Sequence, residues 1–173
     1  MKSKVVIFIL FIAFLRCERG LCQNNKEIEK YLKDGYEKFE QKNYNGAIIS
    51  FNKLIQIVPE NGVAYYIRGK CRFELNLLDD ALADFNKVIE LLPDNYEAYF
   101  NRGRIKTGMN DFEGGIADYS LAIKLKPDNA MAYFNRGNSK YYLKDMTGCC
   151  IDWQKALELG YDDAKTWIKK YCK

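Results

Sequence analysis

The hexapeptide AYFNRG fills residues 98–103 and recurs letter for letter at residues 132–137. A near copy, AYYIRG, precedes both at residues 64–69, so the three copies begin 34 positions apart. A fixed period of this length is typical of proteins built by stacking one repeated unit. Because catalytic residues usually occur once, a segment that recurs unchanged argues against an active site within it. The repeat therefore predicts the architecture of the chain before it indicates a function.

Alignment on this period gives four units, at residues 28–61, 62–95, 96–129 and 130–163. Each unit contains two helical patterns, and positions within a unit are numbered from its first residue. Position 8 is always glycine: Gly35, Gly69, Gly103 and Gly137. Position 20 is small and position 24 is a large aromatic residue, with Ala47, Ala81, Gly115 and Cys149 at the former and Phe51, Phe85, Tyr119 and Trp153 at the latter. Position 32 is proline in the first three units: Pro59, Pro93 and Pro127.

These positions predict steric roles in a pair of helices. Glycine at position 8 and a small residue at position 20 let two antiparallel helices approach closely, while the ring at position 24 fills the space beside the crossing. Proline lacks an amide hydrogen and cannot continue a helix, so the chain must turn there into the next unit. In the last unit Tyr161 replaces proline, and Gly160 supplies the helix stop. Ala164, Trp167 and Tyr171 then recur at helical spacing and are expected to cover the end of the stack.

The whole pattern resembles the tetratricopeptide repeat (TPR), and the match covers residues 28–159 with a further helix to residue 172. The segment from Cys150 to a last helix ending in KYC is similar to the ends of many exported bacterial TPR proteins. The resemblance implies an all-α fold, a right-handed α-solenoid of four helix-turn-helix units plus a capping helix. The repeat domain would span residues 28–173, with the capping helix at residues 162–172.

Charged residues recur together at positions 7 and 23. Position 7 holds Arg68, Arg102 and Arg136, and position 23 holds Asp84, Asp118 and Asp152. The first unit has Asp34 and Ser50 instead, so it departs from the pattern at both positions at once. We therefore expect an arginine–carboxylate pair that holds the two helices of each unit together, with ligand binding as the alternative role.

In the TPR family the first helices line a concave face, chiefly at positions 2, 5, 9, 12 and 13. Carried over to this chain, the resemblance implies a partner-binding groove made of Tyr36, Tyr66, Lys70, Phe73, Phe100, Arg104, Phe134, Asn138, Tyr141 and Tyr142. Aromatic walls with Lys70 and Arg104 in the middle suit an extended or helical peptide with apolar anchors and an acidic group. The alternative is that several rings pack between neighbouring units. The pattern with which some TPR proteins hold the terminal carboxylate of chaperones is absent, since only Asn101 matches it.

The first 22 residues are interpreted as a secretory signal peptide. Lys2 and Lys4 precede an apolar run from Val5 to Leu15, which is too short for the roughly 20 residues that cross a bilayer. A lipid anchor on Cys17 or Cys22 and a retained signal anchor remain alternatives. Residues 23–27 would form a short linker. The mature protein is therefore expected outside the cytoplasm, periplasmic or extracellular, with membrane contact only through the signal or a lipid anchor.

Composition lowers the expectation of several functions. Of the net charge of +4, +3 lies in residues 1–22, so the repeat region carries +1 and gives no broad attraction for nucleic acid. The chain contains no histidine, the commonest general base and metal ligand. We expect no enzyme activity, cofactor or metal. The expected function is a non-catalytic module that binds a protein or peptide in its groove, and the alternative is a structural subunit of a cell-envelope assembly.

Four cysteines follow the signal segment: Cys71, Cys149, Cys150 and Cys172. Cys149 occupies the small position 20 and is expected to pack as an alanine would. Cys150 stands where the other units have isoleucine or leucine, and a capping helix antiparallel to the preceding helix would bring Cys172 toward it. Together with the resemblance of this end of the chain, these positions predict a Cys150–Cys172 disulfide that clamps the cap onto the last unit.

Overall fold

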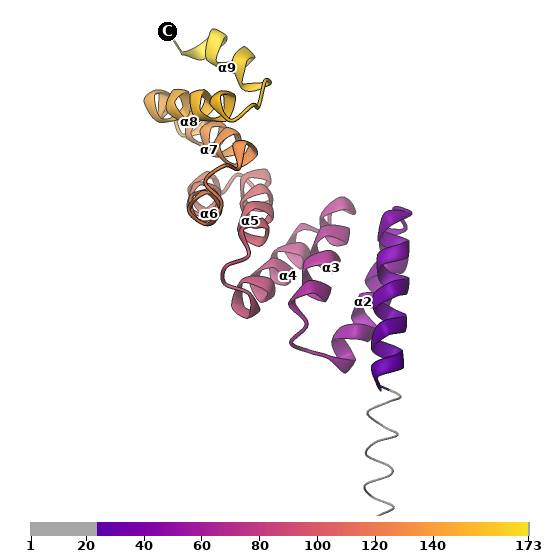
Figure 1. Ribbon diagram of the computed structural model, residues 1–173. Coiled ribbons are helices and arrows are strands. Elements are labelled where there is room, and N and C mark those ends of the chain that lie inside the picture. The colour runs from indigo at the N-terminus through magenta and orange to yellow at the C-terminus, as the bar shows by residue number, and fades with distance from the viewer. Residues whose placement is uncertain (1–23, 173) are drawn as a thin grey trace, which may run out of the picture.

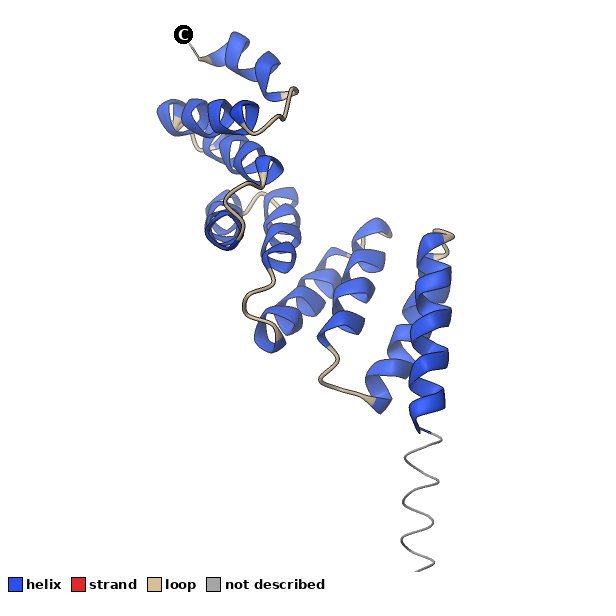
Figure 2. Cartoon of the chain, in the orientation of Figure 1, coloured by secondary structure: helices blue, strands red, loops and turns tan. Residues whose placement is uncertain are grey.

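The computed structural model describes residues 24–172, and all regular structure in this range is helical (Figure 2). The first helix occupies residues 24–40, and the following helices are α2 (Tyr44–Ile57), α3 (Gly62–Glu74), α4 (Leu78–Leu91), α5 (Tyr96–Gly108), α6 (Phe112–Leu125), α7 (Ala130–Tyr142), α8 (Met146–Glu158) and α9 (Ala164–Tyr171). The predicted all-α fold is confirmed. The expected signal peptide at residues 1–22 lies outside the described residues.

Consecutive helices pack side by side and form one continuous stack. Within units α3 packs on α4, α5 on α6 and α7 on α8, while α2–α3, α4–α5 and α6–α7 join neighbouring units. Figure 1 shows the stack running from the first helix at one end to α9 at the other. Among helices α2 to α9, every pair with substantial contacts lies within one unit, between neighbouring units, or between the last unit and α9, so each unit is supported by its neighbours in the stack. The predicted solenoid of helix-turn-helix units is confirmed.

Two kinds of turn repeat with the 34-residue period. Between units, each helix ends two residues before the proline, and an asparagine at position 34 accepts a hydrogen bond from the amide of the next helix, as Asn95 does from Ala98 at 2.8 Å. Within units, position 15 is left-handed: Lys42, Asn76, Asn110 and Lys144, with φ between 58° and 67°. This conformation is rare outside glycine, and it marks the point where the first helix of a unit stops.

Each glycine at position 8 faces the ring at position 24 of its own unit. A Cβ atom added to Gly103 would lie 2.8 Å from a ring carbon of Tyr119, and the same distance separates Gly137 from Trp153. At Gly69 the nearest atoms are the Asp84 Cβ at 3.2 Å and the Phe85 ring at 3.3 Å. These contacts leave no room for a side chain, so the glycines set the separation of the two helices.

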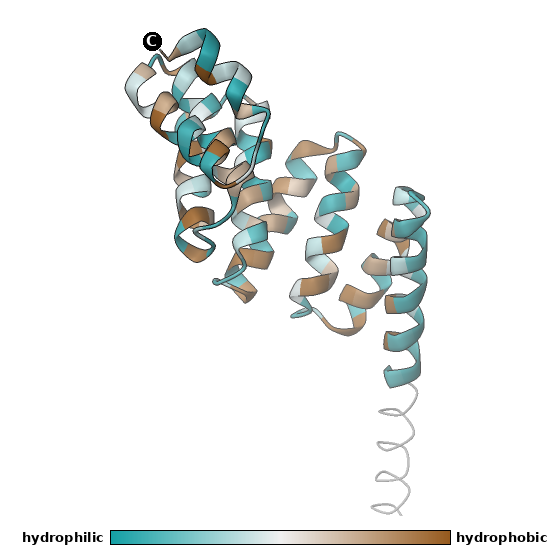
Figure 3. Cartoon of the chain, turned by 45° about the horizontal axis from the view of Figure 1, so that its top comes forward, coloured by the Kyte–Doolittle hydropathy of each residue, from teal (hydrophilic) through white to brown (hydrophobic). Residues whose placement is uncertain are grey.

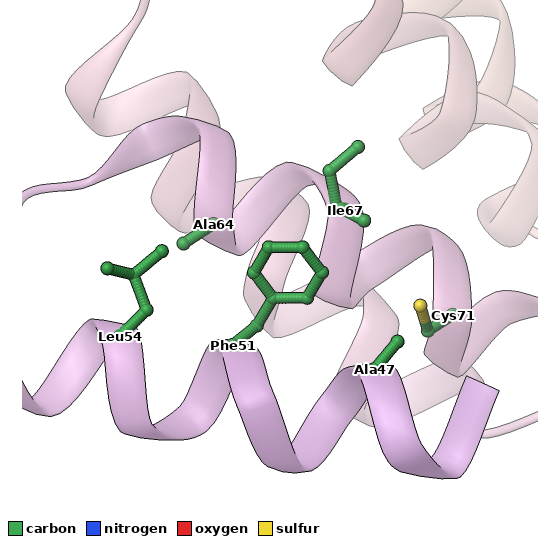
Figure 4. Packing of buried hydrophobic residues seen from close by; sticks show 6 residues of the cluster. All are labelled: Ala47, Phe51, Leu54, Ala64, Ile67 and Cys71. Atoms are coloured by element: carbon green, nitrogen blue, oxygen red, sulfur yellow. The ribbon is translucent and has the colours of Figure 1, made fainter. Parts of the chain in front are cut away.

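The core between units is built from small and large side chains that alternate along two helices. Figure 4 shows Ala47, Phe51 and Leu54 on α2 pointing toward Ala64, Ile67 and Cys71 on α3, and all six are buried. The same arrangement recurs around Phe85 in the next unit. Hydropathy varies along each helix, as Figure 3 shows, because only one side of each helix faces a neighbour. Among residues 24–172, no helix is long and apolar enough to cross a membrane.

The start of the repeat domain differs from the expected linker at residues 23–27. Residues 24–27 belong to the first helix, which therefore extends before position 1 of the first unit. These residues are two asparagines, Lys26 and Glu27, and no glycine or proline interrupts them. Nothing in this segment stops a helix, so the first helix runs N-terminally by about one further turn.

The capping helix α9 covers the end of the last unit. Its Trp167 lies 5.3 Å from Trp153 between ring centres, and Tyr171 lies 4.7 Å from Tyr141. Ala164 is fully buried in the same cluster. The helix begins at Ala164 rather than at residue 162. The structure also joins Cys150 of α8 to Cys172 at the end of α9, with Cα atoms 5.6 Å apart.

Two alanine substitutions on α5 are expected to change stability in opposite directions. Gly103→Ala forces a methyl group against the buried Tyr119 ring, and we expect the free energy of unfolding to fall by about 1–3 kcal/mol. Gly108→Ala, where an added Cβ meets nothing within 4 Å, is expected to raise it by about 0.5 kcal/mol through helix propensity. Urea unfolding of both variants is the measurement, and equal losses would contradict the close-packing account.

The Cys150–Cys172 bond stays a prediction for the protein in solution, and peptide mapping without reductant tests it. We expect a crosslink between the peptides of α8 and the C-terminus that persists in Cys149→Ser and disappears in Cys150→Ser. Reduction is expected to lower the free energy of unfolding by about 3 kcal/mol, the size typical of a closed loop of this length. Recovery of both thiols free in oxidised protein would contradict the prediction.

Candidate functional site

Two hollows open beside Arg104, the side chain that lines both. The α5–α7 hollow has a volume of about 350 Å³ and is lined by Phe73, Arg104, Thr107, Gly108, Phe112, Tyr119, Asn135, Asn138, Ser139 and Tyr142. The α3–α5 hollow has a volume of about 470 Å³ and is lined by Tyr66, Lys70, Tyr96, Glu97, Phe100, Asn101, Arg104, Lys126, Asp128, Asn129, Ala130 and Met131. Most of these residues belong to the first helices of units 2, 3 and 4. Together the two hollows form the candidate groove.

The candidate groove contains most of the side chains that the sequence assigned to a partner-binding face. Those that line one or both hollows are Tyr66, Lys70, Phe73, Phe100, Arg104, Asn138 and Tyr142. They come from α3, α5 and α7, at positions 5, 9, 12 and 13 of their units. The structure thus brings together side chains that are up to 76 residues apart in the sequence.

Three other residues assigned to the groove lie elsewhere. Phe134 packs 4.8 Å from Tyr161, and Tyr141 packs within the cluster formed with α9. The assignment of these two rings to an open groove is wrong for this structure, because α9 lies where a following unit would place its first helix. Tyr36 is 37% exposed and packs edge-on against Phe51, so it lies outside both hollows.

A cation lies on an aromatic ring at two steps of the groove, a step being the place where the first helices of two neighbouring units meet: between units 1 and 2 and between units 2 and 3. Lys70 Nζ is 4.9 Å from the centre of the Phe39 ring, and the Arg104 guanidinium is 4.6 Å from that of Phe73. In each case position 9 of one unit covers position 12 of the unit before it. Neither cation forms a salt bridge with an acidic residue in the part of the chain that the structure describes. Lys70 and Arg104 therefore present charged groups to the groove that no direct ion pair occupies, although Glu97 and Asp128 also line the α3–α5 hollow.

The step between units 3 and 4 is neutral and more open. Position 12 is Thr107, whose hydroxyl lies 2.9 Å from the Gly103 carbonyl and 3.1 Å from the Tyr119 hydroxyl. Position 9 is Asn138, whose side-chain carbonyl accepts a hydrogen bond from Trp153 Nε1 at 2.9 Å. Burial raises the pKa of Tyr119 to about 12, so its hydroxyl stays protonated near neutral pH. This step supplies hydroxyl and amide groups where the earlier steps supply a ring and a cation.

The α3–α5 hollow includes residues that the sequence reasoning missed. Lys126, in the turn after α6, donates a hydrogen bond to the Tyr96 hydroxyl at 3.2 Å and lies over the Tyr96 ring. Burial, with the negative charge of Glu97 nearby, raises the pKa of Tyr66 to about 12. The signal for Lys126 was present, because position 31 is apolar or glycine in the other units. Lys126 was not predicted because the groove was expected on the first helices alone, and this residue lies in a turn between units.

The recurring arginines lie within and between units. Arg102 donates to both carboxylate oxygens of Asp118, at 2.9 and 2.6 Å, and Asp118 is 2% exposed. The same guanidinium donates to Asn86 of the preceding unit at 2.8 Å and lies 5.6 Å from the centre of the Tyr99 ring. The pairs Arg68–Asp84 and Arg136–Asp152 repeat this geometry, and each arginine again reaches the preceding unit.

A second cation contacts each of these aspartates, and the sequence reasoning did not find it. It stands at position 11, one helical turn after the arginine: Arg72, Lys106 and Lys140. In the first unit Lys38 occupies this position and donates to Asp34 at 2.7 Å. Ser50 also donates to Asp34, and these hydrogen bonds lower the pKa of the Asp34 carboxyl. The first unit thus keeps a polar contact between its helices with different partners.

Among residues 24–172, no group of three or more cysteine, aspartate or glutamate side chains is placed to hold a metal ion. Burial raises the pKa of the Cys71 thiol to about 11, so this buried thiol is not a reactive nucleophile near neutral pH. The side chains that line the groove offer charge, hydrogen-bonding groups and aromatic faces.

Removal of one arginine is expected to destabilise the fold. Arg102→Met leaves the buried Asp118 with Lys106 alone, and we expect the free energy of unfolding to fall by about 2–4 kcal/mol. Arg104→Met, the same change two residues along α5, removes an exposed cation without an ion pair and is expected to cost under about 0.5 kcal/mol. Urea unfolding compares the two, and a loss at Arg104→Met equal to that at Arg102→Met would contradict the structural role of the pair.

Family models match two parts of the chain. Residues 63–95 match the model described as tetratricopeptide repeat, and residues 103–143 match the model described as TPR repeat. No curated protein matches the sequence. The two matched segments fall on units 2 to 4.

Solved structures share the fold over most of the chain. A crystal structure of MamA is 25% identical over 86% of this chain and 86% of that chain, with a TM-score of 0.76. YrrB, described as a TPR protein with an unusual peptide-binding site, is 22% identical over 93% and 87%, with a TM-score of 0.75. The first TPR of Spaghetti (RPAP3), bound to the HSP90 peptide SRMEEVD, is 24% identical over 69% and 94%, with a TM-score of 0.66.

Proposed function

Because this chain is a tetratricopeptide-repeat protein, we propose that it binds a segment of another protein in the candidate groove, outside the cytoplasm, and performs no chemistry of its own. The single observation that carries this proposal is the pair of cations in the groove, Lys70 and Arg104, which lie on aromatic faces and form no salt bridge within the described residues; Arg104 lines both hollows and Lys70 lines the α3–α5 hollow. A groove of this kind suits an acidic segment with apolar anchors.

The placement of the cations favours specific recognition over general charge attraction. Phe39 and Phe73 hold Lys70 and Arg104 in place, so little side-chain freedom is lost when a carboxylate binds. The neighbouring rings of Tyr66 and Phe100 line the α3–α5 hollow and offer apolar contact beside the charge. Charge and apolar surface therefore lie within reach of one short segment.

Peptide binding by proteins of the same fold supports the proposal. YrrB is described as having a peptide-binding site, and the RPAP3 repeat is bound to a peptide with two glutamates and a terminal aspartate. This chain is under 25% identical to YrrB and to the RPAP3 repeat, so the similarity shows a shared fold alone. The proposal for this chain rests on the residues of its own groove. Export is supported by the basic start and the short apolar run of residues 1–22.

A second candidate function is that of a structural subunit in a cell-envelope assembly. Apolar side chains exposed on second helices favour it: Ile49 is 57% exposed on α2, Leu121 41% on α6 and Ile151 64% on α8. They lie outside the candidate groove and would be covered by a permanent partner. A protein that is monomeric and monodisperse when purified alone favours the binding module, and one that aggregates favours the subunit.

Selection from a random peptide library tests the proposed function. We expect the purified protein to enrich peptides that combine aspartate or glutamate with aromatic or aliphatic residues. The double change Phe100→Ala with Arg104→Glu is expected to weaken their binding at least about tenfold, as loss of a central anchor and its charge does. Fluorescence anisotropy of labelled peptides is the measurement.

A matched control removes one apolar contact and reverses one charge outside the groove. Leu121→Ala with Lys124→Glu changes exposed residues of α6 and is expected to leave affinity unchanged within about twofold. Peptides that lose affinity for this control while they keep it for the groove variant would contradict the groove and favour the second function.

A further inference from the structure

The third unit lacks the aromatic ring that every other unit carries at position 12. This position holds Phe39, Phe73 and Tyr141 in units 1, 2 and 4, but Thr107 in unit 3. Each of the three rings is covered by the next layer of the stack: Lys70 lies on Phe39, Arg104 lies on Phe73, and Tyr171 of α9 packs on Tyr141. The repeat itself therefore shows that an aromatic ring fits at this place between two layers.

The α5–α7 hollow lies where the missing ring would be. Thr107 and Gly108 line it in place of the larger residues that the other units have at positions 12 and 13. Its volume of about 350 Å³ is at the low end of the roughly 300–1,000 Å³ of ligand pockets, so it suits a side chain better than a large ligand. Phe73 lines one part of it, and Tyr142, stacked on Phe112 at 4.8 Å, lines another.

Polar groups and charge in the hollow narrow the chemistry of its occupant. The hydroxyls of Tyr119 and Thr107 and the amide of Asn138 line the hollow and can hydrogen-bond to a phenol. Arg104 is the one charged residue among the lining residues, and no acid accompanies it. Charge complementarity therefore calls for a carboxylate on the occupant, near its ring.

We propose that the α5–α7 hollow receives an aromatic side chain of the bound segment, with a carboxylate of that segment paired to Arg104. The partner supplies the aromatic ring that the third unit lacks at position 12, so all four units have a ring at this place only in the complex. This inference rests on the proposed function and names the anchor of the same groove. Tyrosine fits best, because its hydroxyl can meet the polar groups of Tyr119, Thr107 and Asn138.

Titration with N-acetyl-tyrosine, which carries both the phenol and a carboxylate, tests the hollow directly. We expect saturable chemical-shift changes of the Thr107 methyl group and the Asn138 side-chain amide in NMR spectra of the protein. N-acetyl-tyrosinamide, which lacks the carboxylate, is expected to bind about two- to fivefold more weakly, and N-acetyl-leucine more weakly than N-acetyl-tyrosine.

Two variants test the site with residues that other units carry at the same positions. One fills the hollow with a ring, and the other offsets the charge of Arg104. Thr107→Phe restores the ring of position 12 and is expected to weaken N-acetyl-tyrosine binding at least about tenfold with the thermal midpoint kept or raised. Gly108→Glu restores the glutamate of position 13 one turn after Arg104, where an added Cβ meets nothing within 4 Å. It is expected to weaken N-acetyl-tyrosine about two- to fivefold more than it weakens N-acetyl-tyrosinamide, because only the former carries the carboxylate that pairs with Arg104. This second variant keeps the test valid if the first fails to fold.

Matched controls are Thr147→Phe, which adds the same ring at an exposed site on α8, and Gly108→Gln, which adds a side chain of the same length as glutamate without its charge. Thr147→Phe is expected to bind N-acetyl-tyrosine as the unchanged protein does, and Gly108→Gln is expected to keep the ratio of the affinities for N-acetyl-tyrosine and N-acetyl-tyrosinamide. Absence of a saturable shift at Thr107, or equal binding by Thr107→Phe, overturns the inference. Self-association of the protein that Thr107→Phe abolishes also overturns it, since the occupant is then a second copy of this chain.

The peptides from the library separate this inference from the proposed function. Peptides that depend on Phe100 but bind Thr107→Phe unchanged leave the proposed function standing and overturn the inference. Binding of N-acetyl-tyrosine at Thr107 without recovery of any peptide overturns the proposed function and leaves the hollow as a site for an aromatic ring. Peptides that contain tyrosine beside an acidic residue and fail to bind Thr107→Phe support both.

Discussion

A glycine that faces a buried aromatic ring sets the distance between the two helices of every unit. A Cβ atom added to Gly35, Gly103 or Gly137 would lie 2.8 Å from the ring at position 24, so a side chain at any of these positions would push the helices apart. Since the next unit packs on both helices of the one before it, a change in this distance would propagate along the stack. The shape of the groove therefore depends on a contact that lies beneath it.

Hydrogen bonds and ion pairs at the edge of the core also hold these helices together. Each recurring arginine meets a buried aspartate within its unit, an asparagine or serine of the preceding unit and the face of a tyrosine. The second cation at position 11 offsets the negative charge of an aspartate that is 2% exposed. Apolar packing sets how closely the helices approach, while these directional contacts fix their register.

The sequence was sufficient for the fold because steric positions recur. Glycine at position 8 and a ring at position 24 have one arrangement that buries both, and proline at position 32 marks each turn. The cations at position 11 were not predicted because lysine and arginine both occur there and resemble solvated residues of a helix surface. Lys126 was missed because it lies in a turn between units, and residues 24–27 were assigned to a linker although nothing in them stops a helix.

The candidate groove could be predicted only in part. Positions 5, 9 and 12 led to Tyr66, Lys70 and Phe73, which line the two hollows because a first helix of the next unit follows each of them. Phe134 and Tyr141 occupy the same positions in the last unit, where α9 replaces the next layer and covers them. The sequence shows that unit 3 lacks the aromatic ring of position 12. Only the structure shows that a hollow lies there and that the next layer of the stack covers the rings of the other units.

The arginine that reaches back to the preceding unit has no counterpart on α9. Asn52, Asn86 and Ser120 at position 25 each receive such a contact from the following unit, whereas Gln154 of the last unit is exposed. At this one joint the predicted link between Cys150 and Cys172 stands in place of the guanidinium. With this bond formed, the two ends of the solenoid are unequal: a covalent bond holds the last layer, whereas noncovalent contacts hold the first helix, so thermal fraying is expected to begin at the first helix.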